Sequence, residues 1–280
     1  MRLLSSALTL LASALWDREF LPFRALNFIV RQRVEPLKIM PCKIKKIPLS
    51  NLKWFVQRFP NQSCIVCSEP SRHVVCQSCE DEFSMTTKRC LSCALPLNQS
   101  LDYCGNCLRA SPSFHRAFTL YDYEGVVAYL IKKMKYEARL SVIRFFAEKI
   151  AEQIDKMQSI GHYYEVMIPM PLHKRRLRER GYNQVVELLR DLNKKAVIDT
   201  KSVQRLKQTA PLTDLSLPQR KKEIKGAFSL SQPLPYKSIL LVDDVMTSCT
   251  SLNELAKTIL KQSPEVKRCD VLTLARAELE

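Results

Sequence analysis

The chain of 280 residues lacks an apolar run long enough to cross a membrane. The longest run near its start, residues 3–15, is interrupted by Ser5, Ser6, Thr9 and Ser13 and falls short of the roughly 20 residues that a spanning helix needs. The sequence therefore argues against a transmembrane protein. A composition of 46% hydrophobic and 26% charged residues also argues against disorder and indicates a globular chain.

Histidine is scarce, with four residues in the whole sequence. His73, His115 and His162 do not lie at metal-ligand spacing from one another. We expect these residues to be incidental. A metal site in this chain must then depend on another type of ligand.

Residues 1–60 contain no motif that the rest of the chain needs, and they form an N-terminal leader of uncertain structure. Arg2, a short apolar core and Ala12-Ser13-Ala14 have the outline of a signal peptide. A true start at Met40 would explain such a tail at least as well. We expect the leader to be dispensable and the protein to be cytoplasmic.

The formal net charge is +16, and its location limits what it can mean. Residues 1–63 hold 11 basic and 3 acidic side chains, and residues 173–225 hold 15 basic and 6 acidic ones. The basic excess thus lies in the leader and in one loop-and-helix region of the main domain. This region could meet an anionic substrate or nucleic acid.

Eight of the eleven cysteines form four C-x2-C pairs within residues 61–110. Two thiolates separated by two residues can project from one tight turn toward adjacent corners of a tetrahedron, and two such turns complete a Zn(Cys)4 site. The spacing therefore predicts a double zinc ribbon with one or two structural zinc ions, and it leaves the pairing of the turns open. The predicted ligands are Cys64, Cys67, Cys76, Cys79, Cys90, Cys93, Cys104 and Cys107.

Disulfides would require an oxidising compartment and normally show varied spacings, and four redox dithiols in tandem would be unusual. Zinc would also supply folding free energy to a module too small to bury a core. Residues 64–110 hold 4 basic and 5 acidic side chains, and two Zn(Cys)4 centres would lower the module's charge to about −5. Phosphates should be repelled, so docking or oligomerisation is the expected role of the module.

Residues 114–280 alternate between strand and helix patterns, which predicts an α/β fold with a mostly parallel central sheet. We expect strands at 118–123, 165–170 and 237–242. Helices are expected at 126–156, 181–192 and 252–261.

The strand at 237–242 carries the clearest chemical pattern. Its run Ile239 to Val242 is apolar on both faces, as in a central parallel strand, and we expect it to end at Asp243-Asp244. Ligands of open α/β sheets bind at the carboxyl ends of the strands. Hydroxyl residues that lead into a helix suit a phosphate, and two carboxylates suit the hydroxyls of a sugar. The pattern therefore predicts a ribose 5-phosphate site, whose loop is Thr247, Ser248, Cys249, Thr250 and Ser251.

This segment, ILLVDDVMTSCTS, resembles the 5-phosphoribosyl-1-pyrophosphate (PRPP) motif of type I phosphoribosyltransferases. The resemblance implies that Asp243 and Asp244 bind the ribose hydroxyls and that loop 247–251 binds the 5′-phosphate. It implies a type I phosphoribosyltransferase fold. Mg²⁺ would be held mainly by the pyrophosphate and the ribose hydroxyls.

The larger pattern resembles the ComF family over roughly residues 60–278. Besides the cysteine module and the PRPP motif, the matching pieces are 131–136 (IKKMKY), 169–184 (PMPLHKRRLRERGYNQ) and 205–228, which ends in Gly226-Ala227-Phe228. The resemblance implies an association with DNA uptake during natural competence, and some members are labelled as phosphoribosyltransferase-like.

Two basic segments take expected roles from this resemblance. Lys174 and Arg175 lie in a segment whose position resembles the loop that binds pyrophosphate; a solvated helix start is the alternative. Arg205 and Lys207 lie in a stretch that resembles the mobile catalytic loop, which would exclude water from the ribosyl centre.

The hydroxyl-rich loop departs from the family at Cys249, where the usual loop has glycine. The β-carbon is expected to cost affinity or to reshape the turn, so binding and turnover become separate questions. The alternatives are a non-enzymatic adaptor that binds single-stranded DNA and docks a competence helicase or other DNA-processing protein, and a nucleobase-salvage transferase.

Overall fold

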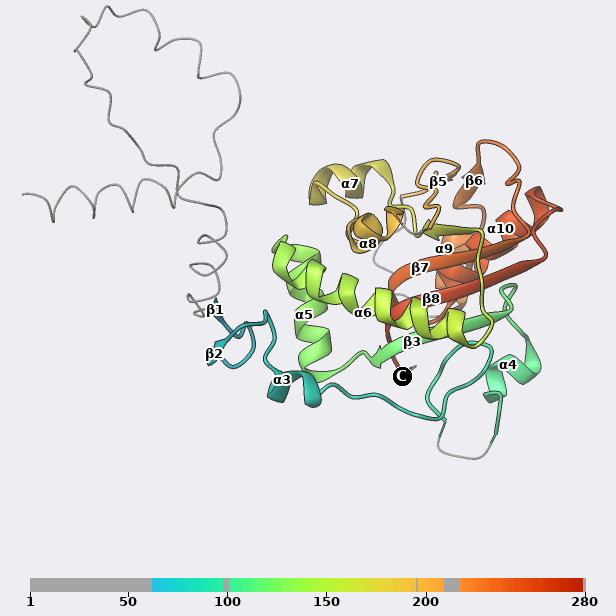
Figure 1. Cartoon of the computed structure of the whole chain (residues 1–280). Coiled ribbons are helices and arrows are strands. Elements are labelled where there is room, and N and C mark those ends of the chain that lie inside the picture. Colours follow the sequence, from blue (N-terminus) through green and yellow to red (C-terminus); the bar gives the residue numbers. More distant parts are fainter. Residues whose placement is uncertain (1–61, 98–100, 195, 209–216, 279–280) are drawn as a thin grey trace, which may run out of the picture. The chain divides into compact units, whose positions relative to one another are not determined.

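The computed structural model describes residues 62–97, 101–194, 196–208 and 217–278 (Figure 1). The predicted leader, residues 1–60, lies outside this part. The cysteine-rich segment contains two very short strands, β1 (Gln62–Ser63) and β2 (Pro70–Ser71), and two short helices, α3 (Gln77–Asp81) and α4 (Gly105–Arg109). Within the described residues, no helix is long and apolar enough to cross a membrane.

The core is a four-stranded sheet in the order β3-β8-β7-β4, and all of its strand pairs are parallel. The strands are β3 (Arg116–Asp122), β4 (Val166–Pro169), β7 (Ser238–Met246) and β8 (Arg268–Arg276). The predicted α/β class is confirmed: a parallel central sheet follows a cysteine-rich module in the sequence. The expected strands at 118–123, 165–170 and 237–242 lie within one to four residues of these bounds.

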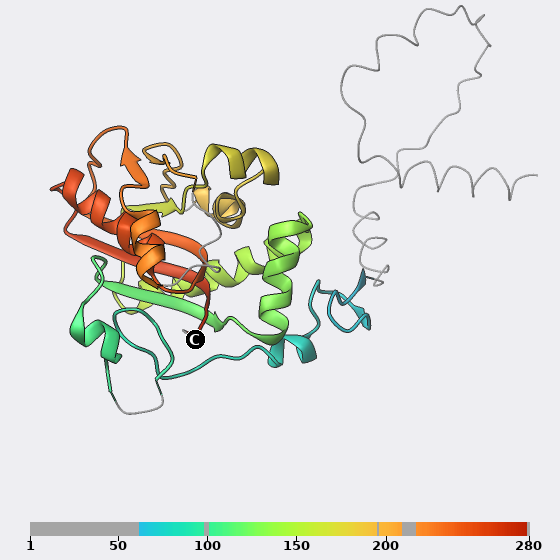
Figure 2. The same ribbon diagram turned by 180° about the vertical axis from the view of Figure 1, so that it is seen from behind.

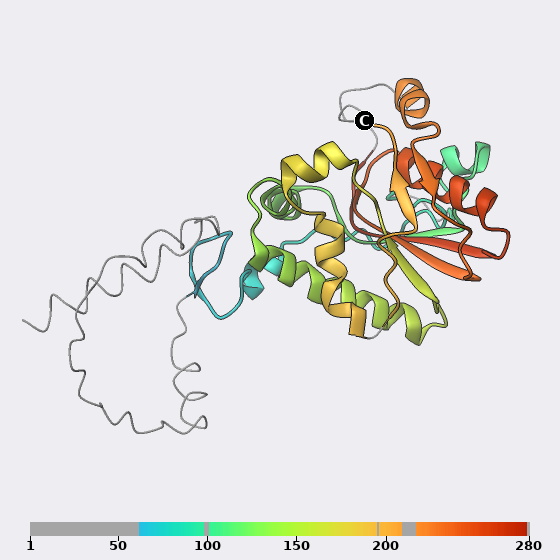
Figure 3. The same ribbon diagram turned by 90° about the horizontal axis from the view of Figure 1, so that it is seen from above.

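Helices cover both faces of the sheet (Figures 2 and 3). On one face, α5 (Gly125–Tyr136), α6 (Leu140–Ser159) and α8 (Gln184–Leu189) pack on Leu240 and Val242. On the other, α10 (Thr250–Gln262) packs on Ile239 and Leu241, and α9 (Leu217–Ile224) packs against α10. These four strand residues are fully buried, and their alternation between two cores explains why the run is apolar throughout.

The expected single helix over residues 126–156 is wrong, because the chain breaks between α5 and α6. Ala138 has a positive φ of 49°, a conformation that a right-handed helix cannot contain. The two helices consequently run in different directions (Figure 1). The break leaves the C-terminal end of α5 beside the carboxyl ends of the strands, where Lys135 lines a pocket.

The segment 171–194 also differs from expectation. It forms α7 (Lys174–Arg180), α8 and a 3-10 helix, Arg190–Lys194, in place of one helix over 181–192. Gly181 ends α7 in the left-handed conformation with φ 82°, and Asn183 caps the start of α8. A glycine is needed at this turn because its φ is positive.

β7 does not end at the two aspartates, as expected, but continues through them to Met246. Its neighbour β4 stops at Pro169, opposite Val242, while β8 accompanies β7 to the end. The last residues of β7 therefore have a strand on one side and an open edge on the other. A separate antiparallel pair, β5 (Val203–Arg205) and β6 (Phe228–Leu230), lies near α10.

Candidate functional site

The eight predicted cysteine ligands form two clusters. The first cluster is Cys64, Cys67, Cys76 and Cys79, and the second cluster is Cys90, Cys93, Cys104 and Cys107. Within each cluster the four sulfurs lie within 4.8 Å of one another. Each cluster therefore joins two consecutive C-x2-C turns, which resolves the pairing that the spacing had left open.

The sulfur positions fit zinc. Cys67 Sγ lies 3.7 Å from Cys76 Sγ, and Cys93 Sγ lies 3.6 Å from Cys104 Sγ. In a tetrahedron with Zn–S bonds of about 2.3 Å, neighbouring sulfurs are about 3.8 Å apart. Zinc held by either cluster would be structural, because four sulfurs leave no open coordination position.

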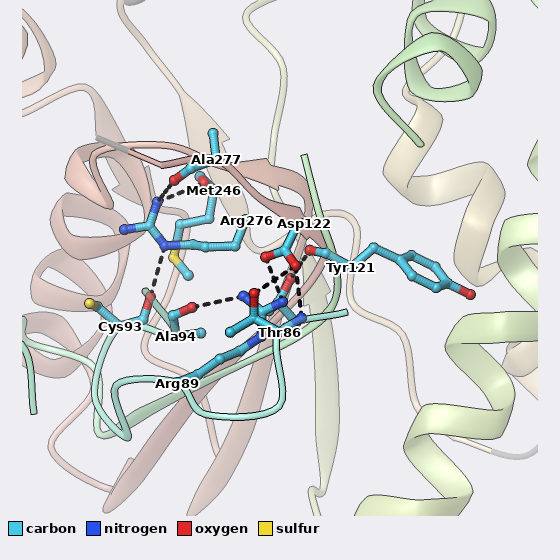
Figure 4. A network of polar contacts seen from close by, with 10 residues as sticks. Thr86, Arg89, Cys93, Ala94, Tyr121, Asp122, Met246, Arg276 and Ala277 are labelled. Carbon is cyan, nitrogen blue, oxygen red and sulfur yellow. Dashed lines mark hydrogen bonds and ion pairs between the residues drawn. The ribbon is translucent and has the colours of Figure 1, made fainter. Parts of the chain in front are cut away.

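The second cluster rests on the strand ends of the α/β domain (Figure 4). Asp122, the last residue of β3, accepts a 2.8 Å bond from Arg89 and two from Thr86. Arg89 also donates to the carbonyl of Ala94, directly after Cys93. A largely buried ion pair thus fixes the first turn of this cluster to β3.

Arg276, the last residue of β8, makes a second connection to this cluster (Figure 4). Its side chain is almost fully buried, at 1% exposure. The guanidinium donates to the carbonyl of Cys93 at 3.0 Å and to the carbonyl of Met246, at the end of β7, at 3.0 Å. It also donates to the carbonyl of Thr247. The second cluster and the start of the hydroxyl-rich loop are therefore bonded to one side chain.

The acid pair, Asp243 and Asp244, lies at the open edge of β7. Asp244 is buried, and its carboxylate is 2.7 Å from Lys135 Nζ and accepts a 2.5 Å bond from Gln184. Asp243 is partly exposed and accepts a bond from the backbone N–H of Asp244. One carboxylate is thus held by partners, and the other is presented to the pocket.

Burial and the negative charge of Asp244 raise the pKa of Asp243 to about 7. Burial alone would lower the pKa of Lys135, but Asp244 and Asp243 outweigh it and raise that pKa. Near neutral pH, Lys135 is charged and Asp243 is close to its titration midpoint. A ligand that supplies hydrogen-bond donors or a cation to Asp243 would favour its charged form.

The hydroxyl loop, residues 247–251, runs from the end of β7 into the first turn of α10 and lines a small recess of about 50 Å³ together with Asp243. The hydroxyls of Ser248 and Thr250 form a hydrogen bond of 2.7 Å. The N-terminal end of a 13-residue helix carries unpaired backbone N–H groups and partial positive charge. The recess therefore has the polarity that a phosphate requires.

Cys249 has a left-handed backbone conformation, which glycine adopts more readily than other residues. Its φ is 60° and its ψ −3°, the left-handed region, which costs a non-glycine residue about 1–2 kcal/mol. Its side chain packs against the second cluster, and Arg276 donates to its sulfur at 3.7 Å. The cysteine side chain thus lies on the side of the second cluster.

A pocket of about 540 Å³ adjoins the acid pair and will be called the main pocket. Thr247 and Ser251 of the hydroxyl loop line it on one side, and Arg176 and Arg205 line it with positive charge. Burial and the nearby guanidinium of Arg176 lower the pKa of Arg205, so these cations lie close enough to repel each other. An anionic ligand would relieve that repulsion.

The other predicted basic residues lie farther from the acid pair. Lys174 lines a neighbouring pocket of about 420 Å³, which shares Leu172 and Arg205 with the main pocket. Arg175 is exposed and paired with Glu179 at 2.8 Å. Lys207 is exposed and donates to the carbonyl of Lys225. Lys174 and Arg175 begin α7, as in the solvated helix start that the sequence suggests as the alternative to a pyrophosphate loop.

Sequence reasoning missed three residues that build the site: Lys135, Gln184 and Arg276. The first two lie in the segments 131–136 and 169–184, which resemble the ComF family but carry no local signal for a role of either residue. Arg276 had no local signal.

Comparisons with known proteins agree with this architecture. Residues 57–108 match the family described as Double zinc ribbon domain. Competence protein F of Haemophilus influenzae is 30% identical over 232 residues, or 79% of this chain and 100% of that protein. DNA utilization protein YhgH of Escherichia coli K12 is 28% identical over 225 residues, 79% of this chain and 90% of that protein. Competence protein ComFC of Bacillus subtilis is 24% identical over 204 residues, 67% of this chain and 78% of that protein.

The fold and the site define a parallel α/β domain with a hydroxyl-rich loop at the end of one strand and a double zinc ribbon packed on it. Among proteins of this class, the similarity to Competence protein F covers more than two thirds of the chain. The chain belongs to the ComF family.

Zinc content tests the two clusters. We expect two zinc ions per chain, released by a chelator in two phases, because Cys67 of the first cluster is exposed whereas all four cysteines of the second are buried. Metal analysis with a colorimetric chelator measures both quantities. One zinc ion per chain, or release in a single phase, would contradict the assignment.

Because its pKa is raised, the Asp243 carboxylate should lower the free energy of unfolding by an amount that depends on pH. An unfolded chain releases the proton near pH 4, while the folded protein holds it until about pH 7. The folded state binds more protons in between, so stability falls as pH rises from about 4 to 7. Asp243→Asn should therefore raise the melting temperature more at pH 8 than at pH 5. Asp155→Asn, an exposed site on α6, is the control; a pH-independent difference for Asp243→Asn would refute this cause.

Proposed function

We propose that this ComF-family chain binds PRPP with Mg²⁺ in the main pocket and acts as a phosphoribosyltransferase-type protein in DNA uptake. The observation that carries the proposal is the continuity of the acid pair with the hydroxyl loop along the last residues of β7. A sugar and its phosphate need these two kinds of group next to each other. Both also line the main pocket.

Each part of the ligand has a matching part of the site. The 5′-phosphate would occupy the recess of the hydroxyl loop, where hydroxyls and N–H groups converge. The ribose hydroxyls would donate to the acid pair, whose Asp243 is partly exposed to the pocket. The pyrophosphate would lie toward Arg176 and Arg205, with Mg²⁺ neutralising part of its charge.

Transfer would form a bond between an acceptor and the anomeric carbon while the bond to pyrophosphate breaks. The developing positive charge on the ribosyl ring would be stabilised by the nearby carboxylates. Arg205 lines both pockets, so it would lie between PRPP and any acceptor held in the neighbouring pocket. The context of DNA uptake comes from the names of the relatives, Competence protein F and DNA utilization protein YhgH.

Calorimetric titration of zinc-loaded protein with PRPP and Mg²⁺ tests the proposal. We expect saturable, Mg²⁺-dependent binding. Asp243→Asn with Asp244→Asn should weaken it at least about a hundredfold, because two hydrogen bonds to charged groups of about 1.5–3 kcal/mol each are lost. Asp155→Asn should bind as the unaltered protein does. Absence of any binding heat with the unaltered protein would refute the proposal.

A second candidate function is binding of single-stranded DNA by α7. This helix has no buried residue, and Lys174, Arg175 and Arg178 are exposed on it beside the main pocket. A row of exposed cations can follow a phosphate backbone without reading sequence.

Charge reversal tests this candidate. Arg175→Glu with Arg178→Glu should weaken oligonucleotide binding and lower the salt slope by at least about 1, since each lost phosphate contact removes about 0.7. Lys257→Glu with Lys261→Glu, on the exposed side of α10, keeps the same change in net charge and should bind normally. Fluorescence anisotropy at several salt concentrations measures this. If the α7 and α10 double variants lost equal affinity for the oligonucleotide, net charge alone would explain the effect and α7 would be rejected as the site.

A further inference from the structure

Arg276 is a buried cation whose contacts join two functional parts of the chain. Its guanidinium donates to the carbonyls of Cys93, Met246, Thr247 and Ala277 and to the sulfur of Cys249. Met246 and Thr247 are the last strand residue and the first residue of the hydroxyl loop. Cys93 belongs to the second cysteine cluster. One side chain therefore fixes the entrance of the loop relative to that cluster.

A buried guanidinium is costly unless nearby negative charge compensates it. The hydrogen-bond partners of Arg276 described above are carbonyl oxygens and a sulfur, which supply only partial charges. A zinc ion with four thiolates carries a net charge of about −2. With zinc bound, the second cluster would supply this compensation, so the placement of Arg276 depends on the charge state of the cluster.

Cys249 provides an independent contact between the loop and the cluster. It packs against the second cluster from the centre of the hydroxyl loop. Its left-handed backbone is the conformation on which the shape of the loop depends. The contact with the cluster helps to offset the strain of holding a β-carbon there.

The first cluster has a different location. It packs near α6, where Phe83 contacts Phe145 edge-to-face at 6.0 Å and Glu80 pairs with Lys149 at 2.5 Å. Among the interactions described for residues 62–97, those that reach the hydroxyl loop or Arg276 come from the second cluster. The two zinc centres are therefore expected to differ in their effect on the site.

We propose that Arg276 is a positioning residue, through which the zinc-loaded second cluster holds the hydroxyl loop in its phosphate-binding shape. The first cluster stabilises the fold near α6 without this effect. The inference rests on the proposed function for its ligand. The shape of the loop can be measured without the ligand.

A matched pair of cysteine variants tests the proposal. Cys79 and Cys107 are each 6% exposed and each occupy the third position of a five-residue helix, α3 or α4. Cys107→Ser should raise hydrogen exchange in residues 246–253 at least about tenfold, leave strand residues 239–242 protected, and raise the Kd for PRPP with Mg²⁺ at least about tenfold. Cys79→Ser should change each of these less than about twofold. Metal analysis verifies that each variant has lost one zinc ion.

Arg276→Lys provides a second test that keeps the charge and both clusters. Lysine cannot reach several carbonyls at once, so the loop should lose protection and affinity as in Cys107→Ser, while the zinc content stays at two. Arg268→Lys, at the opposite end of the same strand, is the control. The proposal would be overturned if Cys79→Ser and Cys107→Ser had equal effects, or if hydrogen exchange of the loop were unchanged in Arg276→Lys. It would also be overturned if Cys107→Ser and Arg276→Lys both lost protection throughout the sheet. If the unaltered protein does not bind PRPP, the proposed function fails while the exchange data still decide this inference.

Discussion

The site depends on how three parallel strands end at one edge of the sheet. β7 continues past β4, which exposes the acid pair, and β3 and β8 end beneath the second cysteine cluster at Asp122 and Arg276. The guanidinium of Arg276 then connects the end of β7 to the cluster. The cysteine module is thus packed into the α/β domain at the place where a ligand would bind, and its negative charge lies beside a buried cation.

The acid pair shows how the surrounding sequence prepares this edge. Asp244 is held by Lys135 from the end of α5 and by Gln184 from the start of α8, and both positions follow from local breaks in the helices. The positive φ of Ala138 ends α5, and Gly181 and Asn183 turn the chain from α7 into α8. With Asp244 held by Lys135 and Gln184, Asp243 remains to meet a ligand, at the expense of stability near neutral pH.

Much of the fold could be predicted because its signals are local. The run Ile239–Val242 predicts a doubly covered strand, and the C-x2-C spacing predicts a double zinc ribbon with one or two four-sulfur sites. The helix break at Ala138 could not be predicted, since alanine ordinarily favours a helix. The partners of the site were also hidden, because Gln184 and Asp244 lie 60 residues apart and Cys93 and Arg276 lie 183 apart. Contacts over such separations are set by packing of the sheet and leave no mark in a local pattern.

The most direct measurement is a crystal structure of the zinc-loaded protein with PRPP and Mg²⁺. The account predicts the 5′-phosphate within hydrogen-bonding distance of the hydroxyl loop and the ribose hydroxyls on the acid pair. It also predicts that Arg276 still donates to Met246 and Thr247, beside a zinc ion in the second cluster. A sugar phosphate bound elsewhere, or a filled loop with Arg276 displaced from these carbonyls, would contradict the account.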